Sequence, residues 1–156
     1  MPESAGERSG MRGQAYGMGH FQCEAHEAVV IEFSPPPCVH WGMSLANGYW
    51  ECGEYASRQS SLNRAQATLD PDGVMRAVIA HRDPGAANWL DPGGQVDGTL
   101  SIRFLHAERA PEISFQRLPL EALGEALPAD TPRMDADARG EVLAARRKAL
   151  LRRFRE

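Results

Sequence analysis

The chain has 156 residues and a mass of 17.1 kDa, a size that fits one domain. Its composition is 42% hydrophobic and 24% charged, which allows a real core and excludes a fully disordered or collagen-like chain. No apolar run approaches the length of a membrane span, and the first 20 residues lack the apolar segment of a secretory signal. We therefore expect a cytoplasmic protein that does not contact a membrane.

The net charge of −4 is unevenly distributed along the chain. Residues 139–156 carry seven basic and two acidic side chains, a net charge of +5. Residues 1–138 carry ten basic and nineteen acidic side chains, a net charge of −9. A basic tail of this kind either binds nucleic acid or an anionic surface, or forms a helix whose cations lie near its own C-terminus. No aromatic side chains are interleaved with its arginines, so we favour the helix and expect no nucleic-acid partner.

The three cysteines, Cys23, Cys38 and Cys52, are an odd number at irregular spacing, which predicts free thiols in a reducing compartment. Cys23 with His26 and Cys38 with His40 form a weak metal-ligand pattern. Residues three apart on a strand lie on opposite faces, so such ligands would not converge. We expect no metal and no cofactor.

The first half of the chain predicts short extended elements after a disordered leader. Residues 1–18 are polar and rich in glycine, and we assign them to the leader. Residues 27–33 form an apolar run with β-branched side chains, and residues 38–45 alternate in part, so both predict strands. Three consecutive prolines separate these two strands. Residues 49–56 are also expected to be extended.

The second half of the β-rich region contains a turn signal and two alternating segments. Residues 65–69 and 74–80 flank a Pro-Asp-Gly sequence and predict a hairpin. Residues 99–105 and 113–118 alternate polar and apolar side chains, which is typical of strands. We therefore predict a mainly β domain over residues 19–118, a β-sandwich of jelly-roll type.

Residues 119–156 are expected to be a helical tail. Residues 120–127 predict a short helix, and Thr131-Pro132 resembles an N-cap followed by a proline in the first helical turn. The long helix that follows places an apolar stripe on one face, formed by Ala136, Gly140, Leu143, Leu150 and Phe154. We expect this amphipathic helix to pack on the β domain, or to pair with a second copy or a companion domain.

The segment 81–98 is the main candidate site, because a long irregular loop in a compact domain is commonly functional. It gathers an imidazole, a guanidinium, two carboxylates, an amide and an indole on His81, Arg82, Asp83, Asn88, Trp89 and Asp91. In a catalytic interpretation His81 is a general base oriented by Asp83, and Arg82 binds an anion. His40 is the alternative base.

Two other interpretations of the same residues remain open. In the first, Asp83 and Asn88 hold the loop by hydrogen bonds to the backbone, and Trp89 fills the core. In the second, Trp41 and Trp89 frame a pocket at the mouth of the sandwich. Its ligand-binding residues are His40, Trp41, Asn88, Trp89 and Asp91.

Several segments of the chain resemble a known family, the domain of unknown function 1214. They are Glu27–Glu32, Leu45–Asn47, Ser61–Gln66, Asp72-Gly73 and the stretch from His81 through Asn88-Trp-Leu-Asp91. The resemblance covers approximately Tyr16 to Leu118. It implies a jelly-roll β-sandwich of mostly bacterial proteins, usually the C-terminal part of a longer chain, and it implies no catalytic residues. Similar proteins usually carry a substantial N-terminal region, whereas only a short leader precedes the domain here.

Three functions are therefore expected as alternatives. The first is a small-molecule-binding or accessory β-sandwich module. The second is a metal-free enzyme, namely a hydrolase, isomerase or cyclase that uses His81 and Asp83. The third is a structural or oligomerisation domain that acts through its C-terminal helix.

Overall fold

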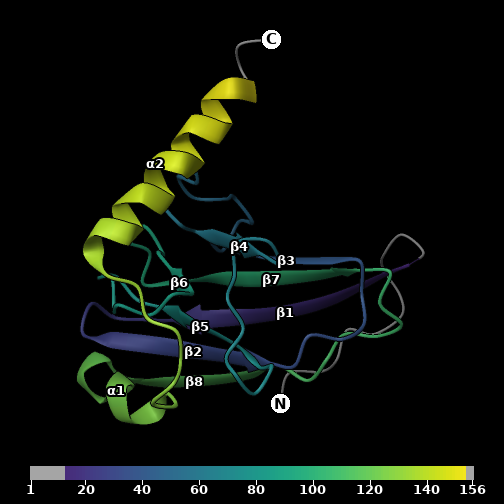
Figure 1. Cartoon of the computed structure of the whole chain (residues 1–156), viewed down its shortest axis with the longest axis horizontal. Helices are drawn as coiled ribbons and strands as arrows, with labels where there is room; N and C mark the ends of the chain where they lie inside the picture. The colour runs from purple at the N-terminus through teal and green to yellow at the C-terminus, as the bar shows by residue number, and fades with distance from the viewer. Residues whose placement is uncertain (1–12, 154–156) are drawn as a thin grey trace.

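A computed structural model describes residues 13–153 as two four-stranded sheets stacked face to face, followed by helices (Figure 1). Sheet A contains, in spatial order, β1 (Gln14–Gln22), β7 (Asp97–Leu105), β3 (His40–Ala46) and β4 (Ser61–Asn63). Sheet B contains β6 (Trp89–Leu90), β5 (Met75–Ile79), β2 (Glu27–Phe33) and β8 (Ser114–Pro119). The prediction of a mainly β protein with two packed sheets and a C-terminal helix is confirmed.

Alternation of side chains decides which face of each strand enters the core. On β7, the buried residues Leu100, Ile102 and Phe104 point between the sheets, and the residues between them point outward. β7 pairs antiparallel with β1 on one side and β3 on the other. In sheet B the pairings are antiparallel except between β5 and β6, which run parallel.

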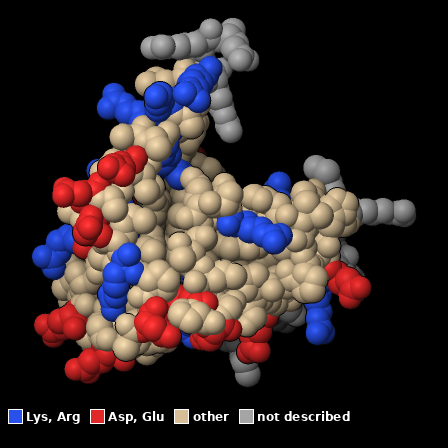
Figure 2. All heavy atoms as spheres, viewed as in Figure 1, with Lys and Arg blue, Asp and Glu red and all other residues tan. Residues whose placement is uncertain are grey.

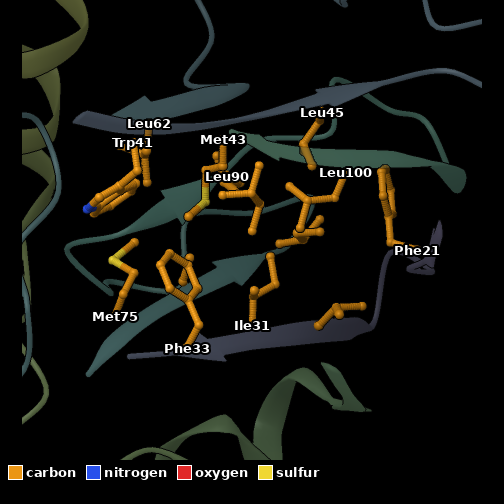
Figure 3. Close-up of a cluster of buried hydrophobic side chains, with 14 of the residues drawn as sticks. Phe21, Ile31, Phe33, Trp41, Met43, Leu45, Leu62, Met75, Leu90 and Leu100 are labelled. Atoms are coloured by element: carbon orange, nitrogen blue, oxygen red, sulfur yellow. The ribbon is translucent and has the colours of Figure 1, made fainter. Parts of the chain in front are cut away.

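The space between the two sheets is filled by side chains from both of them (Figure 3). Phe33 of β2 packs edge-to-face on Trp41 and on Phe104 of sheet A, with ring centroids 5.5 Å and 5.6 Å apart. Met75 and Leu90 belong to the same cluster. The interior of the sandwich is therefore a packed core.

The outer faces of the two sheets differ. The outer face of sheet B carries Val30, Val78 and Leu118, which pack with Leu123 and Leu127 of the segment that follows β8. This segment contains the 3₁₀ helix η1 (Leu120–Ala122) and the short helix α1 (Leu123–Ala126), at the place where the sequence predicts a helix. On β3 and β7 of sheet A, by contrast, the outward residues are mostly polar and only partly buried.

The last helix, α2 (Ala136–Arg153), leaves the sandwich at an angle, and its upper part extends beyond it (Figure 1). The Asp135 carboxylate accepts a hydrogen bond of 2.8 Å from the backbone N–H of Ala138 and so caps the helix. Arg139 is buried, and Arg146 is half-buried against residues that precede and begin β4. No helix among residues 13–153 is long and apolar enough to cross a membrane.

The predicted leader is wrong for residues 14–18, which belong to β1, whereas residues 1–12 lie outside the described part of the chain. The glycines that indicated disorder have a packing role instead. A Cβ atom on Gly19 would come within 2.7 Å of the Phe115 ring, so only glycine allows this approach of β1 to β8. The glycine content of this segment therefore indicated disorder, although these glycines allow β1 to pack closely against its neighbours.

The predicted hairpin is also wrong. Its turn exists, because the backbone N–H of Asp70 donates to the carbonyl of Val74 at 3.0 Å. Residues 65–69 form no strand, however, and β5 pairs with β2 and β6 instead. Residues 49–56 form no strand and are irregular, with a single bridge between Ala46 and Cys52.

Two details of the helical tail differ from the prediction. Thr131 does not cap α2. It is buried, and its hydroxyl donates to the Asp70 carboxylate at 2.6 Å. Ala136 and Gly140 are exposed, so the side of α2 that faces the sandwich is formed by Arg139, Leu143, Arg146 and Leu150. The last residue of the predicted stripe, Phe154, lies outside the described residues.

Candidate functional site

Trp89, predicted to frame a pocket, is a core residue. Its ring is 8% exposed, and its Nε1 donates to the carbonyl of Ala80 at 2.8 Å. The guanidinium of Arg139 lies over the ring, 5.4 Å from its centroid. Trp89 packs with the helical segment on the outer face of sheet B, whereas Trp41 is buried between the sheets. The predicted pocket framed by these two rings therefore does not form.

Asn88 acts as an internal clamp rather than a ligand-binding group. Its side chain is buried, and Oδ1 accepts a hydrogen bond of 2.9 Å from the N–H of Thr68. Its Nδ2 donates to the carbonyls of Thr68 at 2.6 Å and Arg76 at 2.8 Å. These contacts join the loop to the segment on either side of the Pro-Asp-Gly turn and leave little of the amide for a ligand.

The predicted catalytic residues lie near one another in sequence, but they serve separate contacts. The Nε2 atom of His81 lies 2.7 Å from the carbonyl oxygen of Cys23. The Asp83 carboxylate accepts hydrogen bonds of 2.9 Å from both Arg139 Nε and the N–H of Gly85. Within residues 13–153, no hydrogen bond joins His81 to Asp83, and Arg82 is exposed. A base and its orienting carboxylate are therefore not assembled here.

Asp91, predicted to bind a ligand, is also used by the loop itself. It is 7% exposed, and its carboxylate accepts hydrogen bonds of 2.8 Å from Arg58 and from the N–H of Gly93. Together with Asn88 and Trp89, it supports the interpretation in which this loop is held by its own polar groups. The prediction of an irregular loop over residues 81–98 is wrong in part, because Trp89 and Leu90 form β6 and β7 begins at Asp97. The segment is thus a fixed part of the sandwich.

The structure instead places a hollow of about 480 Å³ on the outer face of sheet A. Outward-pointing side chains of all four strands of this sheet line it, together with Gln66 from the turn after β4. The polar and charged residues in this lining are Gln14, His40, Ser44, Ser61, Asn63, Gln66, Ser101 and Arg103. Of these, only His40 was predicted from the sequence as a site residue.

The charge of the hollow is unlike that of the whole chain. No Asp or Glu of the described residues 13–153 lines it, although the chain has 21 acidic residues. Arg103 is exposed, its guanidinium lies over the Tyr16 ring at 5.2 Å from the centroid, and no carboxylate of residues 13–153 forms an ion pair with it. The hollow therefore presents an unpaired positive charge that the Tyr16 ring holds in place.

Two side-chain amides of the hollow are oriented to donate hydrogen bonds. Gln14 uses its Oε1 to accept the Tyr16 hydroxyl at 2.6 Å, and Asn63 uses its Oδ1 to accept the N–H groups of Ala65 and Gln66. Both amide oxygens are thus occupied, and the NH₂ groups are left to donate. The hydroxyls of Ser44 and Ser101 lie 3.1 Å apart at the middle of the face.

One end of this face is closed by α2. The Arg146 guanidinium donates to the carbonyl of Tyr55 at 2.7 Å, to the carbonyl of Ser61 at 3.1 Å, and to the Ser61 hydroxyl. Burial at this contact lowers the pKa of Arg146, and the nearby charge of Glu54 opposes the shift. Residues 13–153 contain no group of three or more His, Cys, Asp or Glu side chains that could hold a metal ion.

The outward residues were missed for a definite reason. In β3 and β7 the alternation marks Ser44, Ser101 and Arg103 as residues that point away from the core, which is correct. The alternation does not show that β3 and β7 are neighbours, or that no other described element packs over their outer face. Only the pairing of β3 with β7, more than fifty residues apart, brings the three side chains together.

The chain matches no protein-family model and no curated protein. Two solved structures are similar to it. One is the crystal structure of an uncharacterized protein from Burkholderia cenocepacia, with a TM-score of 0.69 and 29% identity over 72% of this chain and 32% of that chain. The other is the VPA0106 protein from Vibrio parahaemolyticus, with a TM-score of 0.53 and 16% identity over 65% of this chain and 30% of that chain. The match to VPA0106 shows the fold alone, and the chain spans about a third of the length of each structure.

Proposed function

We propose that this chain is a small-molecule-binding β-sandwich module whose ligand carries a carboxylate and lies over the outer face of sheet A. The observation that carries this proposal is the composition of the hollow. Although the chain has an excess of acidic residues, no carboxylate of residues 13–153 lines this hollow, whereas an unpaired arginine, a histidine and several amide groups do. Such a surface attracts and orients an anion.

The register of sheet A supports a binding mode. Arg103 on β7 faces Gly42 on β3, and His40 lies two residues before Gly42 on the same face. Diagonal neighbours of this kind are about 7–8 Å apart, which suits one carboxylate between them or the two carboxylates of a small diacid. Gly42 has no side chain, so the floor between Arg103 and Asn63 stays open.

Five of the polar side chains that line the hollow have a role in this mode. The Arg103 guanidinium binds the carboxylate in a charge-assisted contact, and the amides of Gln14 and Asn63 donate to its oxygens or to hydroxyl groups of the ligand. Ser44 and Ser101 accept or donate at the middle of the face. The ligand is therefore small and polar.

We also propose the jelly-roll description of the sandwich and the relationship to the domain of unknown function 1214. The course of the chain supports the first, because it changes sheets after β1, β2, β4, β6 and β7 and stays within a sheet only from β3 to β4 and from β5 to β6. The second rests on the sequence segments between Glu27 and Asp91 that resemble this family.

The test is calorimetric titration of the purified chain with succinate, and with succinamide as the neutral analogue of the same shape. We expect succinate to bind and succinamide to bind far more weakly. Arg103→Gln removes a charged hydrogen-bond donor worth about 1.5–3 kcal/mol, which weakens succinate binding by about 10-fold to 100-fold. Arg117→Gln is the matched control, since Arg117 is an exposed arginine on a strand of sheet B and should leave the affinity unchanged.

A third variant separates the two candidate sites. If Arg82→Gln abolished binding and Arg103→Gln did not, the ligand would lie at the 81–98 loop and the proposal would be wrong. Equal affinities for succinate and succinamide would also contradict it, because the unpaired charge of Arg103 would then have no role.

An accessory role beside a companion domain is the second candidate. The observation that favours it is that both similar structures are about three times as long as the part that matches this chain. In that case the uncovered face of sheet A packs against another domain. Succinate would then not bind to the isolated chain. The substitution Arg103→Gln would also leave the stability of the isolated chain unchanged.

A further inference from the structure

The side of α2 that faces away from the sandwich has an unusual charge order. Asp137, Glu141, Ala144, Lys148 and Arg152 follow one another at spacings of three or four residues, so they lie along one face of the helix. All five are exposed, and they lie opposite the Arg139–Leu143 side that meets the sandwich. Figure 2 shows acidic side chains gathered near the start of α2 and basic side chains towards its outer end.

This order is unfavourable within a single helix. Asp137 and Glu141 are like charges at i and i+4, as are Lys148 and Arg152, and such pairs destabilise an isolated helix by about 0.2–0.5 kcal/mol each. A helix stabilised by its own surface charges places Glu and Lys in alternation at this spacing. No ion pair among residues 13–153 involves any of these four side chains.

The helix dipole explains only part of the pattern. It favours acidic residues in the first turn and basic residues in the last turn, and it weakens beyond them. Asp137 and Arg152 satisfy this rule. Glu141 lies in the second turn and Lys148 lies more than one turn before the end of α2 at Arg153, so neither gains much from the dipole.

A second copy of α2 packed antiparallel would place opposite charges beside these like-charged pairs. If a twofold axis passes between Ala144 and Ala145, Glu141 faces Lys148 of a second copy, and Asp137 faces Arg152 of that copy. Each pair occurs twice by symmetry, which gives four oppositely charged contacts along a helix of about 27 Å. The small side chains of Ala144 and Ala145 then lie at the crossing point, where helices need close approach.

Two further features fit this arrangement. Leu151 is 51% exposed on the same side of the helix, and the antiparallel register places it at the level of Ala138 in a second copy, one half-turn before Gly140. A Cβ atom on Gly140 would meet nothing within 4 Å, so this part of the helix face is open. At the other side, buried Arg139 and half-buried Arg146 fix the helix to the sandwich and present the charged face in one orientation.

We propose that two copies of this chain associate through an antiparallel pairing of α2, in which the acidic first half of each helix faces the basic second half of the other. The face is self-complementary, so one twofold interface satisfies all four charged positions in both copies. The association is independent of the proposed carboxylate site, whose lining residues are on sheet A and the turn after β4.

The test measures the mass of the full chain in solution by sedimentation equilibrium. We expect the wild type to be a dimer at low salt that weakens at high salt, since 1 M salt shortens the Debye length from about 10 Å to about 3 Å. Glu141→Lys and Lys148→Glu each place like charges opposite each other, so both variants should be monomers. Glu125→Lys, on exposed Glu125 of α1, makes the same charge change elsewhere and should remain a dimer.

The double variant and a mixture of the two single variants test whether Glu141 faces Lys148 of the second copy. The double variant Glu141→Lys/Lys148→Glu restores opposite charges at both pairs and should dimerise again. An equimolar mixture of the two single variants should form a heterodimer, because one chain then carries only positive charges at these positions and the other only negative charges. A monomeric wild type, or single variants that dimerise as the wild type does, would overturn the proposal. Circular dichroism of each variant checks that α2 is retained.

Discussion

Asp83 and Arg139 form an ion pair of 2.9 Å across 56 residues of sequence, between the carboxylate of the 81–98 loop and the Nε atom of α2. The same guanidinium donates to the carbonyls of Ala86 and Ala87 and lies over the Trp89 ring. One buried side chain thus orients both the loop and the helix. The loop that is richest in chemical groups is an anchoring point, and the open polar face lies on the other sheet.

We predict that Arg139→Met lowers the free energy of unfolding by about 2–4 kcal/mol, because two carbonyls and the Asp83 carboxylate lose their donor. Asp83→Asn should cost less, since the amide oxygen can still accept the N–H of Gly85. Urea denaturation measures both values. Arg82→Met, at the exposed neighbouring position, should stay within about 0.5 kcal/mol of the wild type. If Arg139→Met were as stable as the wild type, this anchoring role would be excluded.

We predict that Asn88→Ala lowers the free energy of unfolding by about 2–3 kcal/mol, because its buried amide makes three backbone hydrogen bonds. Asn88→Asp should cost at least as much, since a carboxylate cannot donate to the carbonyls of Thr68 and Arg76. Urea denaturation and succinate titration are run on the same samples. The affinity of the folded variant for succinate should be unchanged. If the variant were as stable as the wild type but did not bind succinate, Asn88 would be a ligand-binding residue.

The strands that the sequence predicted well carry a clear local pattern of apolar side chains. Residues 99–105 alternate and place Leu100, Ile102 and Phe104 in the core as β7. Residues 27–33 contain a continuous apolar run and become β2, which is buried on both faces. Such a pattern is local, so it predicts the strand even when the partner strands are unknown.

Pairing between distant strands could not be predicted in the same way. The Pro-Asp-Gly turn suggested that residues 65–69 and 74–80 pair, but β5 lies between β2 and β6, which offer buried apolar partners on both sides. Likewise, Thr131 has the sequence of an N-cap but lies where the Asp70 carboxylate needs a donor. His40 was found because histidine is a recognised catalytic type, whereas Arg103 gained its importance only from the sheet order.

We predict that the stability of the protein falls between about pH 9 and pH 11 through Cys23. Burial, with smaller effects from Glu27 and Glu24, raises the pKa of this thiol from 9.0 to about 11. Below pH 9 the thiol is protonated in both the folded and the unfolded state, so its contribution is constant. Above pH 9 only the unfolded chain loses the proton, and the free energy of unfolding decreases until the folded thiol also ionises near pH 11.

The full decrease is on the order of 3 kcal/mol, at about 1.4 kcal/mol per pKa unit, and roughly half of it has occurred by about pH 10. Comparing urea midpoints at about pH 8 and about pH 10 measures it, with Cys23→Ala as the reference that lacks the thiol. The wild type should lose more stability than Cys23→Ala over this interval, because all other titrating groups are common to both. Parallel pH profiles for the two proteins would rule out a contribution from Cys23.

We predict that Gly98→Ala destabilises the protein by about 1–3 kcal/mol, since an added methyl group would overpack the start of β7. Its Cβ atom would lie 2.8 Å from the Phe21 ring and would also press on the carbonyl oxygen of Ala46. Neither neighbour is the free end of a flexible side chain, so β1 or β3 must shift. Gly53→Ala is the control, because a Cβ atom there meets nothing within 4 Å.

The same substitution tests the link between the packing of sheet A and the proposed ligand site. β7 carries both Ser101 and Arg103, so a shift of this strand against β3 moves these groups relative to His40. Gly98→Ala should therefore weaken succinate binding as well as stability, although the substituted position lies outside the hollow. A variant that unfolds earlier in urea yet binds succinate with wild-type affinity would show that the strand end can move without disturbing the face.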